Sequence, residues 1–209
     1  VSTGDTNTNR VAGAVNLNTG VYYFGGFVDV VNNDGDSNDG DFRIYQYNPG
    51  AGGTGGTVTL KGWLDINATT GANNGDIAFN DSGDLFVVRG NGDTTTIYSV
   101  TAANFTAASG GSIAFSTSAP ITTMDNVNGV AFDADGKGFL GAAGEMRAYG
   151  MPGWTTPYVT STLSRSTDLA SCSSPPTITI EKEIQGGRAA SGDQFKLELK
   201  QGTTLLGEA

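Results

Sequence analysis

The chain has 209 residues and a formal net charge of −10, from 21 acidic and 11 basic side chains, and it contains no histidine. The basic residues are scattered, so the chain lacks the footprint that binding to nucleic acid or to an acidic membrane surface requires. The absence of histidine removes Ser-His-Asp and Cys-His catalysis and the usual zinc sites, although carboxylate catalysis stays open. We therefore do not expect an enzyme. Because no run of 18 apolar residues occurs, we also expect no membrane insertion within this fragment.

Short runs of β-branched and aromatic residues recur along the chain, separated by Gly, Asn and Asp. Such runs are typical of strands bounded by tight turns. In chain order, strands are expected at 21–27, 42–47, 57–63, 75–79, 84–88, 94–100, 112–115, 129–132, 138–141, 145–149, 177–184 and 194–200. Helical periodicity is confined to one weak candidate at 101–108, so the chain is predicted to be all-β.

Two segments repeat at an offset of 53 residues: Asp-Ile-Ala-Phe-Asn-Asp-Ser-Gly-Asp-Leu-Phe-Val at 76–87 and Gly-Val-Ala-Phe-Asp-Ala-Asp-Gly-Lys-Gly-Phe-Leu at 129–140. A looser third copy at 14–24 precedes the first by 63 residues. Each copy predicts a hairpin, and two further strands complete each unit, as in a propeller blade. We predict a partial β-propeller of about three four-stranded blades over 1–170, incomplete because closed propellers have at least four blades. A plain β-sandwich with a coincidental repeat is the alternative.

A linker is predicted at 171–176, Ser-Cys-Ser-Ser-Pro-Pro, because paired prolines and small polar residues are typical of domain boundaries. Its Cys172 is the single cysteine of the chain and has no partner for a disulfide within it. After the linker, 177–184 alternates strictly and 194–200 alternates again. The pattern predicts the N-terminal strands of an immunoglobulin-like or prealbumin-like sandwich over 177–209, truncated after two or three strands.

The segment Val-Asn-Gly-Val-Ala-Phe-Asp-Ala-Asp-Gly-Lys-Gly-Phe-Leu-Gly at 127–141 resembles the blade motif of bacterial propeller-like domains. Those domains occur in large secreted or cell-wall-anchored proteins, especially of actinobacteria, and 166–172 is similar to their end. The segment 177–208 is similar to the start of a prealbumin-like module related to collagen-adhesin B-type repeats. The resemblance implies a bacterial cell-surface location, a structural or adhesive role, and a host or cell-surface protein or glycan as partner. It implies no known reaction.

The resemblance also singles out Lys182, which shares one strand face with Ile178, Ile180 and Ile184. An inward lysine is costly to bury without a partner. In adhesin-type modules a first-strand lysine can form an isopeptide bond with Asn or Asp, and Lys182 stands where that lysine would. An edge lysine that blocks strand pairing is the alternative.

The densest acidic segment is Asn-Asn-Asp-Gly-Asp-Ser-Asn-Asp-Gly-Asp at 32–41. Asp34, Asp36 and Asn38 alternate as oxygen ligands do in calcium loops, and Asp41 ends the segment as a further candidate ligand. Because Asp39 stands where an EF-hand has glycine, and no Glu occupies position twelve, the loop is not an EF-hand. The two open interpretations are a Ca²⁺ site, which would be the chain's one cofactor, and a solvated acidic loop.

Aromatic side chains are the remaining binding candidates. Trp154 lies in Met-Pro-Gly-Trp-Thr-Thr-Pro at 151–157, which is typical of a loop, so we expect its ring to be exposed and able to contact a ligand. The favoured function is a non-catalytic secreted or cell-wall-anchored surface module with a structural or adhesive role. The alternative is a carbohydrate-binding or carbohydrate-active propeller that uses acidic residues and exposed aromatics.

Overall fold

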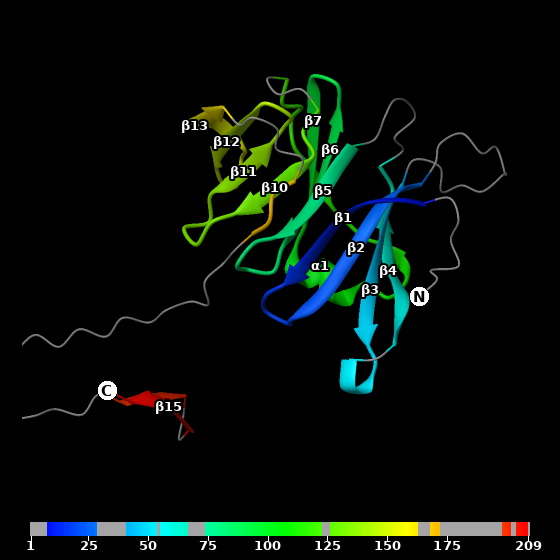
Figure 1. Cartoon of the computed structure of the whole chain (residues 1–209), viewed down its shortest axis with the longest axis vertical. Coiled ribbons are helices and arrows are strands. Elements are labelled where there is room, and N and C mark those ends of the chain that lie inside the picture. Colours follow the sequence, from blue (N-terminus) through cyan, green and yellow to red (C-terminus); the bar gives the residue numbers. More distant parts are fainter. Residues whose placement is uncertain are drawn as a thin grey trace, which may run out of the picture. The chain divides into compact units, whose positions relative to one another are not determined.

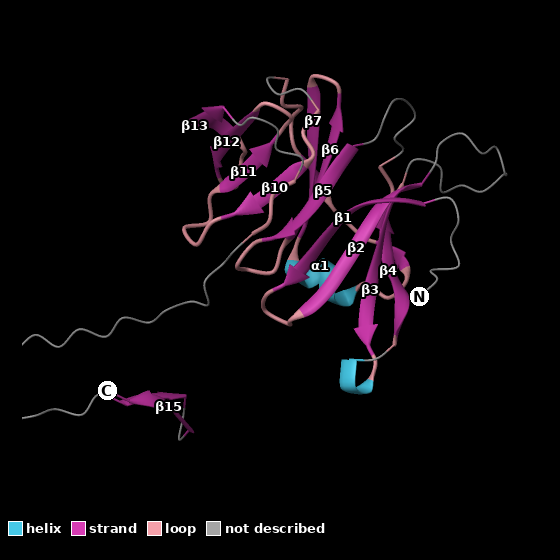
Figure 2. Ribbon diagram, in the orientation of Figure 1, coloured by secondary structure: helices cyan, strands magenta, loops and turns pink. Residues whose placement is uncertain are grey.

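The computed structural model describes residues 8–28, 41–53, 55–66, 74–122, 126–162, 168–171, 198–201 and 204–208. Strands dominate this part of the chain, which also contains one short α-helix, α1 (Ala102–Ala107), and one 3-10 turn, η1 (Ala51–Gly53) (Figures 1 and 2). The prediction of an all-β fold is thereby confirmed, and none of the described sheets closes on itself. No described helix has the length and apolar character needed to cross a membrane.

The chain divides into two compact units, Val1–Pro176 and Thr177–Ala209. Within the second unit the described residues form one antiparallel hairpin, β14 (Glu198–Gln201) and β15 (Thr204–Glu208). The strand expected at 177–184, which contains Lys182, lies outside the described residues.

Three sheets make up the described part of the first unit. The first sheet is ordered β1 (Thr8–Asn16), β2 (Val21–Val28), β3 (Phe42–Pro49), β4 (Gly56–Leu64) and β8 (Gly111–Ser112). The second is ordered β5 (Asn74–Phe79), β6 (Leu85–Asn91), β7 (Thr94–Val100) and β9 (Ser116–Thr117). The third is ordered β10 (Gly129–Phe132), β11 (Gly138–Gly141), β12 (Glu145–Gly150) and β13 (Thr155–Thr162).

The region around 111–117 differs from its prediction as one strand. It forms two short strands that join different sheets: β8 pairs in parallel with β4, and β9 pairs antiparallel with β7. The chain therefore ties the first sheet to the second here. A run of apolar residues predicts extended structure, but it does not specify which of two neighbouring sheets supplies the partner.

The sequence repeat corresponds to three hairpins with matching register. Ala78 pairs with Phe86 in the second sheet, and Ala131 pairs with Phe139 in the third. In the first sheet the matching pair is Ala14 with Tyr23. The third copy is therefore offset by 64 residues before its turn (14 to 78) and by 63 after it (23 to 86), because that turn is one residue longer.

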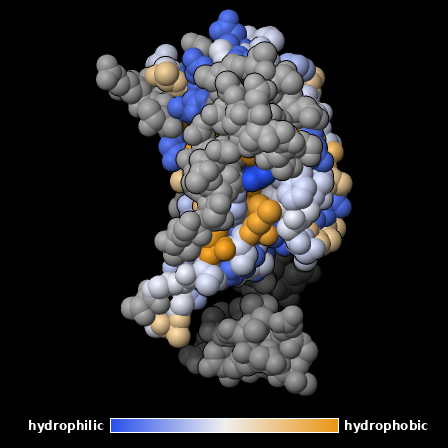
Figure 3. Space-filling view, turned by 90° about the vertical axis from the view of Figure 1, so that its right-hand side faces the viewer, coloured by the Kyte–Doolittle hydropathy of each residue, from blue (hydrophilic) through white to orange (hydrophobic). Residues whose placement is uncertain are grey.

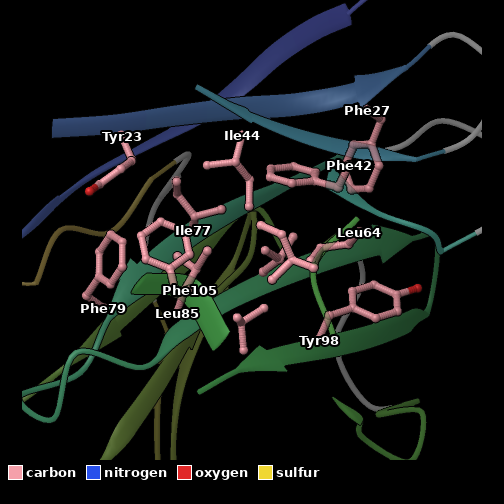
Figure 4. Close-up of a cluster of buried hydrophobic side chains, with 13 residues drawn as sticks. Tyr23, Phe27, Phe42, Ile44, Leu64, Ile77, Phe79, Leu85, Tyr98 and Phe105 are labelled. Carbon is pink, nitrogen blue, oxygen red and sulfur yellow. The ribbon is translucent and has the colours of Figure 1, made fainter. Parts of the chain in front are cut away.

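The second sheet is buried on both faces. One face packs against the first sheet through Ile77, Phe79, Leu85 and Val87, and the cluster continues with Tyr23, Phe42, Ile44 and Leu64 (Figure 4). The other face packs against the third sheet through Ala78, Phe86, Val88 and Ile97, which meet Val130, Phe132, Leu140 and Tyr149. Because side chains alternate between faces, burial on both sides requires consecutive apolar residues, as in the four from Leu85 to Val88.

Helix α1 closes one end of the core between the first two sheets. The weak helical signal at 101–108 predicted a helix at this place. The Thr101 hydroxyl accepts a hydrogen bond of 3.2 Å from the amide of Asn104, which caps the first turn. The ring of Phe105 lies edge-on to Tyr23 and Phe79, with centroids 4.9 and 5.3 Å away (Figure 4). Burial of that ring therefore holds this six-residue helix in place, since so short a helix is not stable alone.

Candidate functional site

A cleft of about 360 Å³ lies where β1, β5 and β10 come together beside the segment Asp168–Ser171. These three strands, here called the cleft strands, are each the first strand of their sheet, and each lies at a sheet edge. Strand β5 lies between the other two and contacts both (Figure 1). The walls are mainly apolar, with Val15, Leu17 and Tyr22 on the side of the first sheet and Phe79 and Leu169 among the residues opposite.

The edge of β10 is closed by side chains from other parts of the chain. The amide of Val130 donates a 2.9 Å hydrogen bond to Oδ2 of Asp76 on β5. The amide of Phe132 donates a 3.0 Å hydrogen bond to Oγ of Ser171. These bonds leave the two outward amides of β10 unable to pair with another strand.

No such partner reaches the edge of β1 from the described residues. The amide of Val28 donates to the carbonyl of Asp41, the residue before β3. Alternation along β2 therefore directs the amide of Tyr23 toward β1 and makes Ala14–Tyr23 a hydrogen-bonded pair. The amides of Gly13 and Val15 therefore point away from β2. Within the described part of the chain neither amide has a hydrogen-bond partner beyond β2, and both residues are exposed.

Among the described residues beside the cleft strands, Asp76 carries a buried carboxylate whose pKa lies well above its ordinary value. Its side chain is 3% exposed, and its Oδ1 accepts a 2.7 Å bond from the amide of Ile77. Burial raises the pKa of Asp76 to about 7; the hydrogen bonds from Val130 and Ile77 oppose the rise, and the charge of Asp168 adds to it. Both carboxylate oxygens bond to backbone amides, so Asp76 joins β5 to β10 instead of facing a ligand.

Other acidic residues of the hairpins shape turns. Oδ1 of Asp84 accepts a 2.8 Å bond from the amide of Ala102 at the start of α1. Oδ1 of Asp133 accepts bonds of 2.8 and 3.0 Å from the amides of Lys137 and Asp135. Short polar side chains commonly satisfy turn amides in this way. These carboxylates therefore have structural uses that explain their presence.

The expected exposure of Trp154 is wrong. Residues 151–154 do form a turn, but 155–157 of the predicted loop begin strand β13. Trp154 is only 5% exposed and packs against Phe86, Phe132 and Tyr149, each with a ring centroid 5.9 Å away. Gly138 provides the space, since a Cβ there would lie 2.7 Å from the indole ring. A loop pattern in the sequence predicts the backbone conformation. It does not predict whether the side chain of a loop residue is buried by other parts of the chain.

The candidate calcium ligands are only partly described. Asp34, Asp36 and Asn38 lie outside the described residues, as does Cys172. Asp41 immediately precedes β3 and is 2% exposed. Its backbone carbonyl accepts a hydrogen bond from the amide of Val28. The described residues contain no group of three acidic or cysteine side chains arranged to hold a metal ion. Calcium binding by the acidic loop stays a prediction.

A row of three aromatic rings lies beside the cleft, and sequence reasoning had not singled out Tyr22 and Phe24 in it. The ring of Phe24 stacks between Tyr22, at 6.0 Å, and Tyr45, at 5.6 Å. Tyr22 is 43% exposed and belongs to the cleft wall. Apolar patches are visible on the side of the molecule shown in Figure 3. The sequence pattern that could have predicted this row is the alternation along β2, where Tyr22 and Phe24 share one strand face and Tyr23 on the other face belongs to the core.

Asp76 and Ser171 were also missed. Asp76 opens the first repeat copy at the position where the second copy has Gly129, and this departure from the repeat was the available signal. No family model matches the chain, and no curated protein matches its sequence. The candidate site is therefore defined by its geometry.

Proposed function

We propose that the chain is a non-catalytic module of a secreted or cell-surface protein, with a structural or adhesive role. The observation that carries this proposal is where the charged and apolar side chains around the cleft lie. Among the described residues no charged side chain lines the cleft, and the buried carboxylate of Asp76 beside it bonds to backbone amides. Exposed apolar side chains such as Val15 and Tyr22 line the walls. An apolar cleft with a few polar groups suits binding.

We also propose that the first unit is propeller-like. Three successive sheets with the same hairpin register, stacked face against face, support this interpretation. In a propeller the first strands of successive blades surround a central channel, which would correspond to the cleft. The second unit would be a prealbumin-like sandwich, for which the hairpin of β14 and β15 is consistent evidence.

The proposal is tested with beads that carry the purified chain. We expect them to adhere to immobilised extracellular-matrix proteins, and we expect no turnover of chromogenic glycosides. The Tyr22→Ala variant should lower adhesion, whereas Leu60→Ala, which shortens an exposed apolar side chain that does not line the cleft, should leave it unchanged. Glycoside hydrolysis abolished by a single Asp substitution would contradict a non-catalytic role.

A carbohydrate-binding role is the second candidate, and the exposed ring of Tyr22 favours it, because aromatic faces stack on sugar rings. A glycan array distinguishes the carbohydrate-binding role from the structural or adhesive role. Retention of defined glycans that is lost in Tyr22→Ala supports sugar binding, and adhesion to proteins alone supports the structural or adhesive module.

A further inference from the structure

We propose that the outer edge of β1 binds an extended peptide of a partner protein by strand addition, with an apolar peptide side chain entering the cleft. This inference rests on the proposed binding role and names the partner's chemistry. In strand addition, main-chain hydrogen bonds supply affinity, and pockets for alternate side chains supply specificity.

The first argument is the difference between equivalent strand edges. Val130 and Phe132 occupy in β10 the positions that Gly13 and Val15 occupy in β1, as the matched hairpin registers show. The β10 amides are bonded to Asp76 and Ser171. The β1 amides face solvent beside the cleft, without such partners in the described part of the chain. A strand edge in this state is a template for another strand.

The second argument is that the chain already covers one cleft strand with a segment of its own. The segment Asp168–Ser171, which has no regular secondary structure, lies along β10 and contacts it through Ser171. Leu169 lies over two glycines of the third sheet: a Cβ at Gly129 or Gly141 would come within 2.9 or 3.0 Å of its side chain. In this molecule the cleft strand β10 is thus already covered by an apolar residue from a segment without regular secondary structure.

The third argument is the chemistry of the wall next to β1. Val15, Leu17 and Tyr22 are 44%, 47% and 43% exposed, and all three line the cleft. No charged side chain lines it among the described residues. The peptide residue that enters should therefore be apolar. The net charge of −10 favours basic residues on either side of it, because opposite charge speeds encounter.

The test selects linear 12-residue peptides from a phage-displayed library on the immobilised full chain. Selected peptides are synthesised with a single N-methyl group at each amide in turn, and their affinity is measured by calorimetry. Since only alternate amides of an added strand face its neighbour, N-methylation should weaken binding at least tenfold at every second position and less than threefold between them. Uniform sensitivity along the peptide would overturn the proposal.

Variants of the protein supply a second readout. Val15→Pro removes one outward amide of β1, and proline is tolerated where an edge amide faces solvent. We expect it to weaken the selected peptides at least tenfold, whereas Val15→Ile keeps the amide, the β-branched shape and the apolar wall and should change affinity less than threefold. Equal binding by both folded variants would contradict strand addition. Should Val15→Pro unfold, the N-methyl scan on the unchanged protein decides.

Two further outcomes separate this inference from the proposed function. Glycan or matrix adhesion that depends on Tyr22, with no peptide enriched by the selection, would overturn peptide binding and leave the binding module standing. Concentration-dependent dimerisation lost in Val15→Pro, with no peptide able to compete, would assign the edge to a second copy of the chain and overturn the partner peptide.

Discussion

The carboxylate of Asp76 on β5 accepts a 2.9 Å hydrogen bond from the backbone amide of Val130 on β10, 54 residues later in the chain. Val130 is 1% exposed, so without the carboxylate its amide would be buried without a partner. The bond therefore joins the second and third sheets at their first strands. Because this structural carboxylate is ionisable, the stability of the fold should depend on pH.

We predict that Asp76 makes folding stability fall as pH rises from about 4 to about 7. Its folded-state pKa of about 7 lies above its ordinary value of 3.8, so the folded state binds the proton more tightly than the unfolded state. The contribution is full below pH 3.8 and is lost as pH passes 7; it amounts to at most about 4 kcal/mol.

Urea unfolding at a series of pH values measures this effect for the native chain and for Asp76→Asn. The difference between their unfolding free energies should change across this pH window, because the amide does not titrate. Parallel pH profiles would show that Asp76 keeps an ordinary pKa in the folded protein.

The contact between Gly138 and Trp154 predicts coupled substitutions. Gly138→Ala should destabilise the fold by about 1–3 kcal/mol, since its new methyl group would overlap the indole ring. Trp154→Phe shortens the ring system and should relieve this overlap. The double variant should therefore be less destabilised than the sum of the two single variants by at least about 0.5 kcal/mol. Thermal and urea unfolding check this, and strict additivity would contradict the packing.

Lys61 on β4 predicts a smaller effect at the end of α1. Its ammonium donates hydrogen bonds of 2.8 and 3.3 Å to the carbonyls of Ala108 and Thr106 and lies 5.3 Å from the centre of the Phe105 ring. Burial lowers the pKa of Lys61. Lys61→Met should cost about 1 kcal/mol, because the site is partly exposed and solvent screens the charge.

The comparison is made by urea unfolding, with Lys61→Arg as the variant that keeps the positive charge. We expect Lys61→Arg to retain most of the stability. An unfolding free energy unchanged in Lys61→Met would mean that these carbonyls gain nothing from the ammonium beyond what water offers.

The acidic loop at 32–41 is tested by calcium titration. A calcium site predicts that about 5 mM Ca²⁺ raises the melting temperature, because an ion that binds only the folded state stabilises it. The rise should disappear in the Asp34→Ala, Asp36→Ala double variant. A melting temperature that is the same with Ca²⁺ and with chelator supports a solvated acidic loop.

The strands were largely predictable because their signals are local. Alternating or consecutive apolar residues, together with glycines at the turns, placed 94–100, 129–132 and 138–141 at their observed bounds. The split at 111–117 was not predictable, because partner choice depends on which sheet lies alongside. Trp154 was misplaced for a related reason: its cover comes from residues distant in sequence.

The sequence by itself determined the all-β class, the three related hairpins and the acidic surface, since these follow from composition, side-chain alternation and turn residues. Tertiary structure alone decided which strand edges are closed. Asp76 and Ser171 reach the amides of β10 only because separate segments pack together, while none of the described residues covers the equivalent edge of β1 beside the cleft. Hydrogen-bond satisfaction between distant segments is a property of packing, and no local pattern encodes it.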